Sequence, residues 1–147
     1  MRVLIQRVNE ASVTVDKMVI SKISKGLLIF VCAMADDTEQ EVEKLVSKIS
    51  KIRIFSDIDG KMNKSVIDIE GEALIVSQFT LSADTSRGNR PGFSKAAEPE
   101  RGNYLYKYFI SKLKETDIKT LSGEFGGDMQ VSLINNGPTT IWIDTKI

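Results

Sequence analysis

The sequence has no histidine and only one cysteine, Cys32, among its 147 residues. Without histidine the chain cannot form the Ser-His or Cys-His pair that activates a nucleophile in many hydrolases. One cysteine cannot form an internal disulfide bond, and it cannot supply a zinc site of the usual cysteine and histidine type. We therefore expect no metal or cofactor, and any catalysis must use hydroxyl, amide or carboxylate side chains, backbone groups, or the substrate itself.

Net charge and long apolar runs are also lacking. Lys+Arg and Asp+Glu number 20 each, so a nucleic acid could bind only to a local basic patch. No apolar stretch approaches the length of a membrane span, and the first residues become charged too early for a signal peptide. The hydrophobic fraction of 41% predicts one folded domain over residues 1–147, and the cysteine content favours a reducing, cytoplasmic compartment.

The most informative stretch is Ala73–Leu81, which begins as a continuous apolar run. Such a run predicts a strand that is buried on both faces. Ser77, Gln78 and Thr80 then follow without a turn residue. Hydrogen-bonding side chains at the end of a buried strand either bond to neighbouring backbone or line a cavity. Residue types alone favour the first alternative.

Local patterns elsewhere predict two amphipathic helices and a set of short strands. Thr38–Glu41 forms a capping box at the start of one helix, and Pro99 begins the other. Alternating segments predict strands over residues 2–9, 11–16, 129–133 and 139–144. Together these elements indicate an α/β domain with a curved, largely antiparallel or mixed, barrel-like sheet.

Two turns admit more than one interpretation. Asn136–Pro138 lies between alternating segments, where Asn-Gly is a strong hairpin signal and proline stiffens the chain. A stiff turn could instead present carbonyl groups to a ligand, with the Gly137–Pro138 bond in the cis form. Three glycines surround Phe125, which predicts either an ordinary glycine-rich turn or a backbone that bends around a ligand. In both cases the ordinary turn is favoured by the residues alone.

Two separate motifs change this assessment. Ser77-Gln78-Phe79-Thr80-Leu81 and Asn136-Gly137-Pro138-Thr139-Thr140 resemble the two signature motifs of the D-aminoacyl-tRNA deacylase family. The resemblance covers nearly the whole chain and includes Gln6–Val8, Gly88–Pro91 and Gly123–Met129. Thr139 departs from the family, which more often has valine at this position.

The resemblance implies a homodimeric hydrolase that acts on a carboxylic ester. Its substrate would be the acceptor end of a tRNA carrying a D-amino acid, or glycine mischarged on tRNA(Ala), and its products free amino acid and tRNA. In each subunit Gly137 and Pro138, joined by a cis bond, would enter the pocket of the partner. Their carbonyls would hold the α-amino group and leave no room for an L side chain, which gives chiral quality control in translation.

The resemblance also implies roles for single residues. The catalytic group would be Ser77, Gln78, Phe79 and Thr80, with backbone N–H groups near Phe79 and Thr80 forming the oxyanion site. We expect Thr80 to position water or substrate, because no general base is visible to activate its hydroxyl as a nucleophile. The tRNA 2′-hydroxyl could assist the reaction. The residues expected to bind substrate or shape its site are Gly137, Pro138, Asn136, Phe125, Met129 and Arg7.

Within that set, Phe125 and Met129 would seat the terminal adenine, and Arg7 would brace the Gly-Pro turn. Candidates for the cations that bind the tRNA lie in and after the long loop, namely Arg87, Arg90, Lys95 and Arg101. For any single one of them, a solvated surface charge is the favoured alternative. Two rival functions remain at this point. One is a non-catalytic RNA-binding or tRNA-binding module that uses the same pocket, and the other is an esterase for small acyl esters.

Overall fold

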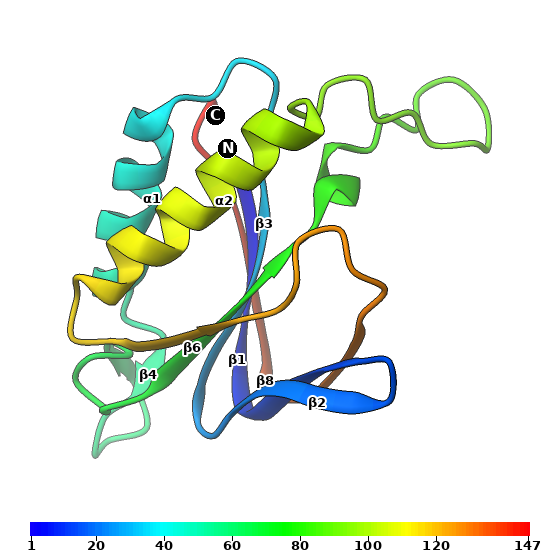
Figure 1. Ribbon diagram of the computed structural model, residues 1–147. Helices are drawn as coiled ribbons and strands as arrows, with labels where there is room; N and C mark the ends of the chain where they lie inside the picture. The colour runs from blue at the N-terminus through cyan, green and yellow to red at the C-terminus, as the bar shows by residue number, and fades with distance from the viewer.

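A curved sheet of six strands carries both helices on one face (Figure 1). The computed structural model describes residues 1–147. The strands are β1 (Arg2–Val15), β2 (Met18–Ile23), β3 (Gly26–Cys32), β6 (Glu72–Ser77), β7 (Lys119–Ser122) and β8 (Gln130–Asp144). Their order is β2-β1-β3-β6-β7, and β8 pairs with β1. The two edges approach each other where the Ser21 hydroxyl donates a hydrogen bond to the Ser122 carbonyl, so the sheet is nearly closed.

The sheet is mixed, because β1 is antiparallel to all its partners whereas β3–β6 and β6–β7 are parallel pairs. The predicted α/β domain with a curved, mixed, barrel-like sheet and two helices is therefore confirmed. A separate two-stranded sheet consists of β4 (Phe55–Ser56) and β5 (Met62–Lys64). No helix of the protein combines the length and apolarity needed to cross a membrane.

Strand β1 organises the sheet by pairing with three neighbours. Arg2–Val8 pairs with β3, Ala11–Val15 pairs with β2, and β8 follows almost its whole length. The two strands predicted over residues 2–9 and 11–16 are therefore one element. No glycine or proline interrupts the chain between them, so the strand bends through register shifts and does not stop.

The hairpin predicted at Asn136–Pro138 is not formed. β8 keeps one direction and remains antiparallel to β1 on both sides of this segment. The flanking pairs are Val8–Asn135 and Gln6–Thr140. Residues 136–139 therefore lie opposite Arg7 alone, as a bulge in a continuous strand. Because β1 is long enough to pair with both halves of β8, a reversal of the chain here would sacrifice one of the two ladders.

The buried strand predicted over Ala73–Leu81 ends at Ser77. The Gln78 N–H still donates to the Val31 carbonyl at 2.8 Å, but the neighbouring strand β3 stops one residue later. With no further ladder available, the backbone folds into the 3₁₀ turn η1 (Phe79–Ser82). Its own bonds run from Leu81 N to Gln78 O at 3.2 Å and from Ala83 N to Thr80 O at 3.1 Å.

The two helices begin where the sequence predicts. α1 (Glu39–Lys51) has Thr38 as its N-cap, and the Glu41 carboxylate accepts from the Thr38 N–H at 2.8 Å, which completes the capping box. α2 (Pro99–Lys114) has Pro99 as its first residue. Proline fits there because its missing N–H would have no acceptor within the helix.

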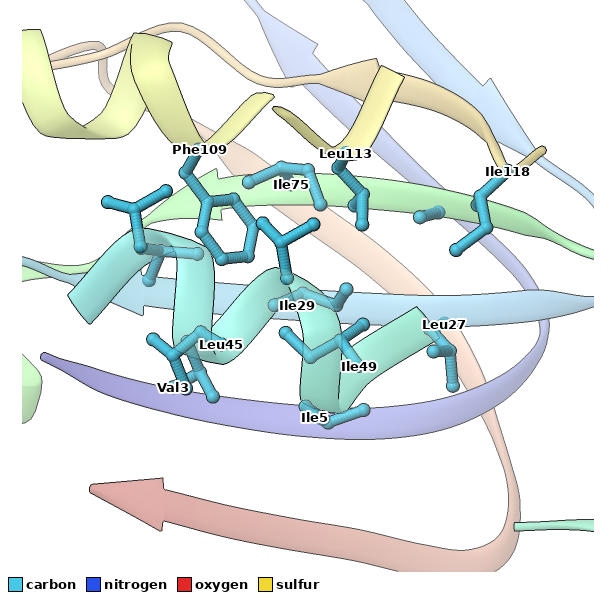
Figure 2. Packing of buried hydrophobic residues seen from close by; sticks show 14 of the residues in the cluster. Val3, Ile5, Leu27, Ile29, Leu45, Ile49, Ile75, Phe109, Leu113 and Ile118 are labelled. Atoms are coloured by element: carbon cyan, nitrogen blue, oxygen red, sulfur yellow. The ribbon is translucent and has the colours of Figure 1, made fainter. Parts of the chain in front are cut away.

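Both helices contribute to one core cluster between themselves and the sheet. In Figure 2, Leu45 and Ile49 of α1 lie over Val3 and Ile5 of β1. Phe109 and its helical neighbours pack from α2 on β6 and β3 in the same way. A second, smaller cluster lies on the other face of the sheet, inside the curve of the barrel. The end of β6 therefore emerges between two packed layers, which holds its polar residues in a fixed place.

Candidate active site

The polar residues of the first motif lie where β6 passes into η1. Ser77 and Gln78 are half-buried, whereas Phe79 and Thr80 are exposed. The Gln78 Nε2 donates to the Thr80 Oγ1 at 2.5 Å. An amide that donates to a hydroxyl cannot also remove its proton, so this contact orients Thr80 and does not activate it as a nucleophile.

The turn η1 is held from behind by three side chains. The Phe79 carbonyl accepts from Ser82 Oγ at 2.7 Å and from Cys32 Sγ at 3.5 Å. Arg2 Nη1 donates to the Leu81 carbonyl at 2.9 Å. The first three carbonyl groups of the turn are thus occupied, since that of Thr80 accepts from the Ala83 N–H. The N–H groups of its first residues, by contrast, have no acceptor within a helical turn and are available to an external oxygen.

A cavity of about 700 Å³ opens beside this strand end. Its walls include Ser77, Gln78 and Phe79 from the first motif, and Phe125 and Met129 from the loop between β7 and β8. The structure therefore brings together five of the residues that the sequence singles out. Thr80 is not among the residues that line the cavity and stands at its margin on η1.

Several wall residues were not anticipated from the sequence. Phe93 packs edge-on against Phe79, with ring centroids 5.1 Å apart. Tyr106 lies 5.6 Å from the Phe125 ring, and its hydroxyl donates to the Ile75 carbonyl at 2.9 Å. The one feature of the sequence that could have indicated a role for Phe93 is that it is a lone aromatic residue in a polar loop. On α2, the side chain of Tyr106 is buried in the core, whereas that of Tyr108 is only partly buried and packs at the edge of the core.

No lysine or arginine lines the cavity, and its two acidic wall residues are Glu98 and Asp128. The N-terminal ammonium of Met1, another wall residue, is paired with Asp37 at 2.8 Å. Burial raises the pKa of the Cys32 thiol to about 11 and that of the Tyr106 phenol to about 12. Both groups are therefore protonated at neutral pH, and Cys32 is no thiolate nucleophile. Such a cavity suits an uncharged or donor-rich group and is unsuited to phosphate.

The residues of the second motif lie together, but outside this cavity. Arg7 Nε donates to the Asn136 carbonyl at 3.0 Å, and Arg7 Nη1 donates to the Ile54 carbonyl at 2.6 Å. The Gly137–Pro138 bond is cis, and both residues are exposed. None of these side chains lines the 700 Å³ cavity of the same chain.

The basic residues expected to contact tRNA are partly neutralised. Arg101 Nη2 lies 3.3 Å from a Glu39 oxygen, and Lys95 Nζ lies 4.0 Å from an Asp84 oxygen. Arg87 and Arg90 are exposed on the long loop and form no ion pair. No group of three or more acidic or cysteine side chains is arranged to hold a metal ion.

Comparison with known proteins agrees with the family that the two sequence motifs resemble. The family model described as D-Tyr-tRNA(Tyr) deacylase matches residues 4–144. The D-aminoacyl-tRNA deacylase of Ruegeria sp. (strain TM1040) is 59% identical over 145 residues, which cover 99% of this chain and 93% of that protein.

Two solved structures share the architecture. The c-Myc DNA unwinding element binding protein superimposes with a TM-score of 0.93 at 38% identity, over 99% of both chains. A probable eukaryotic D-amino acid tRNA deacylase gives a TM-score of 0.85 at 17% identity, over 97% of both chains. At 17% identity the second likeness concerns the fold alone.

Fold and pocket thus define a class of domains with a nearly closed mixed sheet and a cavity at the end of its central strand. The chain belongs to the D-Tyr-tRNA(Tyr) deacylase family. The resemblance that the two motifs suggest is therefore confirmed at the level of the family.

Proposed function

We propose that the protein is a D-aminoacyl-tRNA deacylase, a hydrolase that cleaves the ester between a D-amino acid and the 3′ end of tRNA. Membership of the family supports this activity. The observation that carries the proposal is the cavity, in which the polar end of β6 faces the aromatic and thioether side chains of Phe125 and Met129. An uncharged adenosine and a small aminoacyl group fit its chemistry.

The active unit is a homodimer. A pocket at Ser77–Phe79 and a Gly137–Pro138 turn that lie apart in one chain can be parts of one site only if two chains combine them. In a two-fold dimer each turn enters the other subunit's pocket. The carbonyls of the turn then receive the α-amino group of the substrate and occupy the space that an L side chain would need.

The chemistry needs little from the side chains because an aminoacyl ester is already activated. The first N–H groups of η1 stabilise the developing oxyanion, and Thr80 with Gln78 orients water or substrate. The 2′-hydroxyl of the terminal adenosine assists proton transfer. Arg7 braces the turn through its two carbonyl contacts and does not touch the ester.

Hydrolysis of D-tyrosyl-tRNA, L-tyrosyl-tRNA and glycyl-tRNA(Ala) by the purified protein tests the proposal. We expect rapid loss of the D ester and of the glycyl ester, while the L ester survives. Thr80→Ala should lower the rate on the D ester without admitting the L ester. Equal cleavage of the D and L esters would contradict the steric mechanism.

Binding without turnover would favour the rival function, a tRNA-binding module, and the name of the c-Myc DNA unwinding element binding protein makes nucleic-acid binding worth measuring separately. Cleavage of small acyl esters with no preference for tRNA would instead favour a general esterase. We place the protein in the cytoplasm, where aminoacyl-tRNA is used.

A further inference from the structure

A second concave surface lies on the outer side of α1, remote from the proposed active site. It is a groove of about 320 Å³ lined by Lys44, Ser47, Lys48, Lys51 and Ile52. The lysines stand at positions i, i+4 and i+7 of the helix, so their side chains project from one face. This groove and the cavity of the same chain have no lining residue in common.

The three lysines are poorly neutralised. The nearest acidic group is Glu41, whose Oε1 lies 3.9 Å from Lys44 Nζ, and the other oxygen of Glu41 is already bound by Thr38. Lys48 and Lys51 form no ion pair, and the only side-chain contact of Lys51 Nζ is with Ser47 Oγ at 3.4 Å. In a chain with 20 basic and 20 acidic residues, three exposed lysines on one helix face, of which only Lys44 has a paired acid, form a local positive patch.

The proposed substrate needs such a patch. An RNA substrate brings phosphates, and these dominate its affinity for a protein. The cavity is unsuited to them because no lysine or arginine lines it, the Met1 ammonium is already paired with Asp37, and its wall includes the acidic residues Glu98 and Asp128. Two of the four candidates near the long loop are weakened by ion pairs, since Lys95 faces Asp84 and Arg101 faces Glu39, which leaves Arg87 and Arg90 unpaired there.

We propose that Lys44, Lys48 and Lys51 bind the phosphate backbone of the RNA substrate, away from the ester that is cleaved. This inference rests on the proposed deacylase function and names the surface that holds the body of its substrate. The chain runs from the end of α1 directly to Ile54, whose carbonyl Arg7 joins to the Gly-Pro turn. In the proposed dimer, the Gly-Pro turn of one subunit enters the pocket of its partner. The α1 helix of the first subunit therefore lies near that pocket, on the side where the rest of the bound RNA leaves it.

The test compares two substrates of different length. D-tyrosyl-tRNA reaches the groove, whereas D-tyrosyl adenosine contains no phosphate and occupies only the cavity. The variant carries Lys44→Gln, Lys48→Gln and Lys51→Gln. A matched control neutralises three exposed lysines in β2 and the turns at its two ends, with Lys17→Gln, Lys22→Gln and Lys25→Gln.

The expected effect is confined to the long substrate and to KM. Three phosphate contacts contribute a slope of about −2.7 to the dependence of log affinity on log salt, at about −0.9 per phosphate. Between 50 and 200 mM salt this slope corresponds to about 40-fold in affinity. The α1 variant should lose that part of the salt dependence and show a raised KM for D-tyrosyl-tRNA. Its kcat, and its rate on D-tyrosyl adenosine, should match those of the wild type and the control.

Binding of uncharged tRNA, followed by fluorescence anisotropy across the same salt range, separates this inference from the proposed activity. If the wild type cleaves neither ester but the α1 variant alone loses affinity and salt dependence, the groove still binds RNA and only the deacylase proposal fails. If the α1 variant binds tRNA with the wild-type salt dependence, the inference is overturned. It is also overturned if both substrates lose activity equally.

Discussion

Gly137→Ala tests the geometry of the Gly-Pro turn in a single substitution. Gly137 has φ of +141°, a conformation that residues with a side chain rarely adopt. A Cβ there would lie 2.5 Å from the Thr139 N, 2.6 Å from the Thr139 Oγ1 and 2.9 Å from Arg7 Nη2. Two of these atoms belong to Thr139 and one to the guanidinium that fixes the turn, so the added methyl must displace the turn itself.

The expected loss of stability is about 1–3 kcal/mol, the usual cost of a side chain held in a disfavoured backbone conformation. For a chain of this size, that corresponds to a fall in Tm of roughly 3–9 °C. Activity should fall further than stability, because a displacement of about 1 Å in a positioning group can cost about 100-fold in rate. Thermal unfolding and D-tyrosyl-tRNA hydrolysis, the latter well below the lowered Tm, measure the two effects separately.

Mixing this variant with Thr80→Ala tests whether the two motifs act across subunits. If η1 of one chain and the turn of the other form each site, a hybrid dimer has one intact site and one doubly altered site. Random exchange of equal amounts should then restore about a quarter of the wild-type activity. Absence of any recovery, with hybrid formation verified by native mass spectrometry, would refute the shared site. A wild-type Tm for Gly137→Ala would refute the steric argument.

Three further changes probe single contacts. Arg7→Ala removes two charge-assisted hydrogen bonds, one to the Asn136 carbonyl of the turn and one to the Ile54 carbonyl. This loss should lower the free energy of unfolding by about 1.5–3 kcal/mol and narrow the ratio of D to L ester hydrolysis; an unchanged ratio would remove Arg7 from the site. Glu41→Gln should lower the free energy of unfolding by about 1–2 kcal/mol at pH 7, because it weakens the capping box. The pKa of Glu41 in the folded state, about 2, lies below the ordinary 4.5, so this loss of stability should vanish as the pH falls from about 4.5 towards 2. A difference in urea unfolding that stays constant over this pH range would contradict the argument. Tyr106→Phe should lower the free energy of unfolding by only about 1 kcal/mol, because the Ile75 carbonyl keeps its second donor, the Gly123 N–H at 2.9 Å. Tyr108→Phe is the control: its hydroxyl forms a hydrogen bond on the surface, so the loss of stability should be smaller.

The elements that follow from local chemistry were predictable from the sequence. The start of α1 depends on the contact between Thr38 and Glu41, three residues apart, and the start of α2 depends on one proline. Signals of this kind act within a single turn of chain. They do not require knowledge of the rest of the fold, which is why the helix starts agree with the structure.

The strand ends were less predictable because pairing decides them. Asn136–Pro138 has the composition of a hairpin, yet β1 extends past it and pairs with both flanking segments. Ala73–Leu81 has the composition of one strand, yet β3 ends beside Ser77 and the remaining residues form η1. In each case the outcome depends on the length of a neighbouring strand that lies far away in the sequence.

The assembly of the cavity depends on the same long-range pairing. Phe125 and Met129 reach the end of β6 because β7 runs parallel to it, with Ile75 paired to Ser122, and delivers the glycine-rich loop to the same edge. β7 has only four residues and no clear alternation, and the sequence predicted no strand over them. The two motifs could be linked before the structure only through their resemblance to a family.

In the proposed enzyme, the contacts that distinguish D from L esters are separate from the charges that hold the tRNA. A pocket with no lysine or arginine recognises the aminoacyl adenosine by shape and hydrogen bonds, and these contacts are little affected by salt. A lysine face on α1 that holds phosphates is strongly affected by salt and carries no information about the α-carbon. Chiral selectivity and tRNA affinity should therefore vary independently. The ratio of D to L hydrolysis should stay constant across a salt range over which KM for the tRNA rises many-fold.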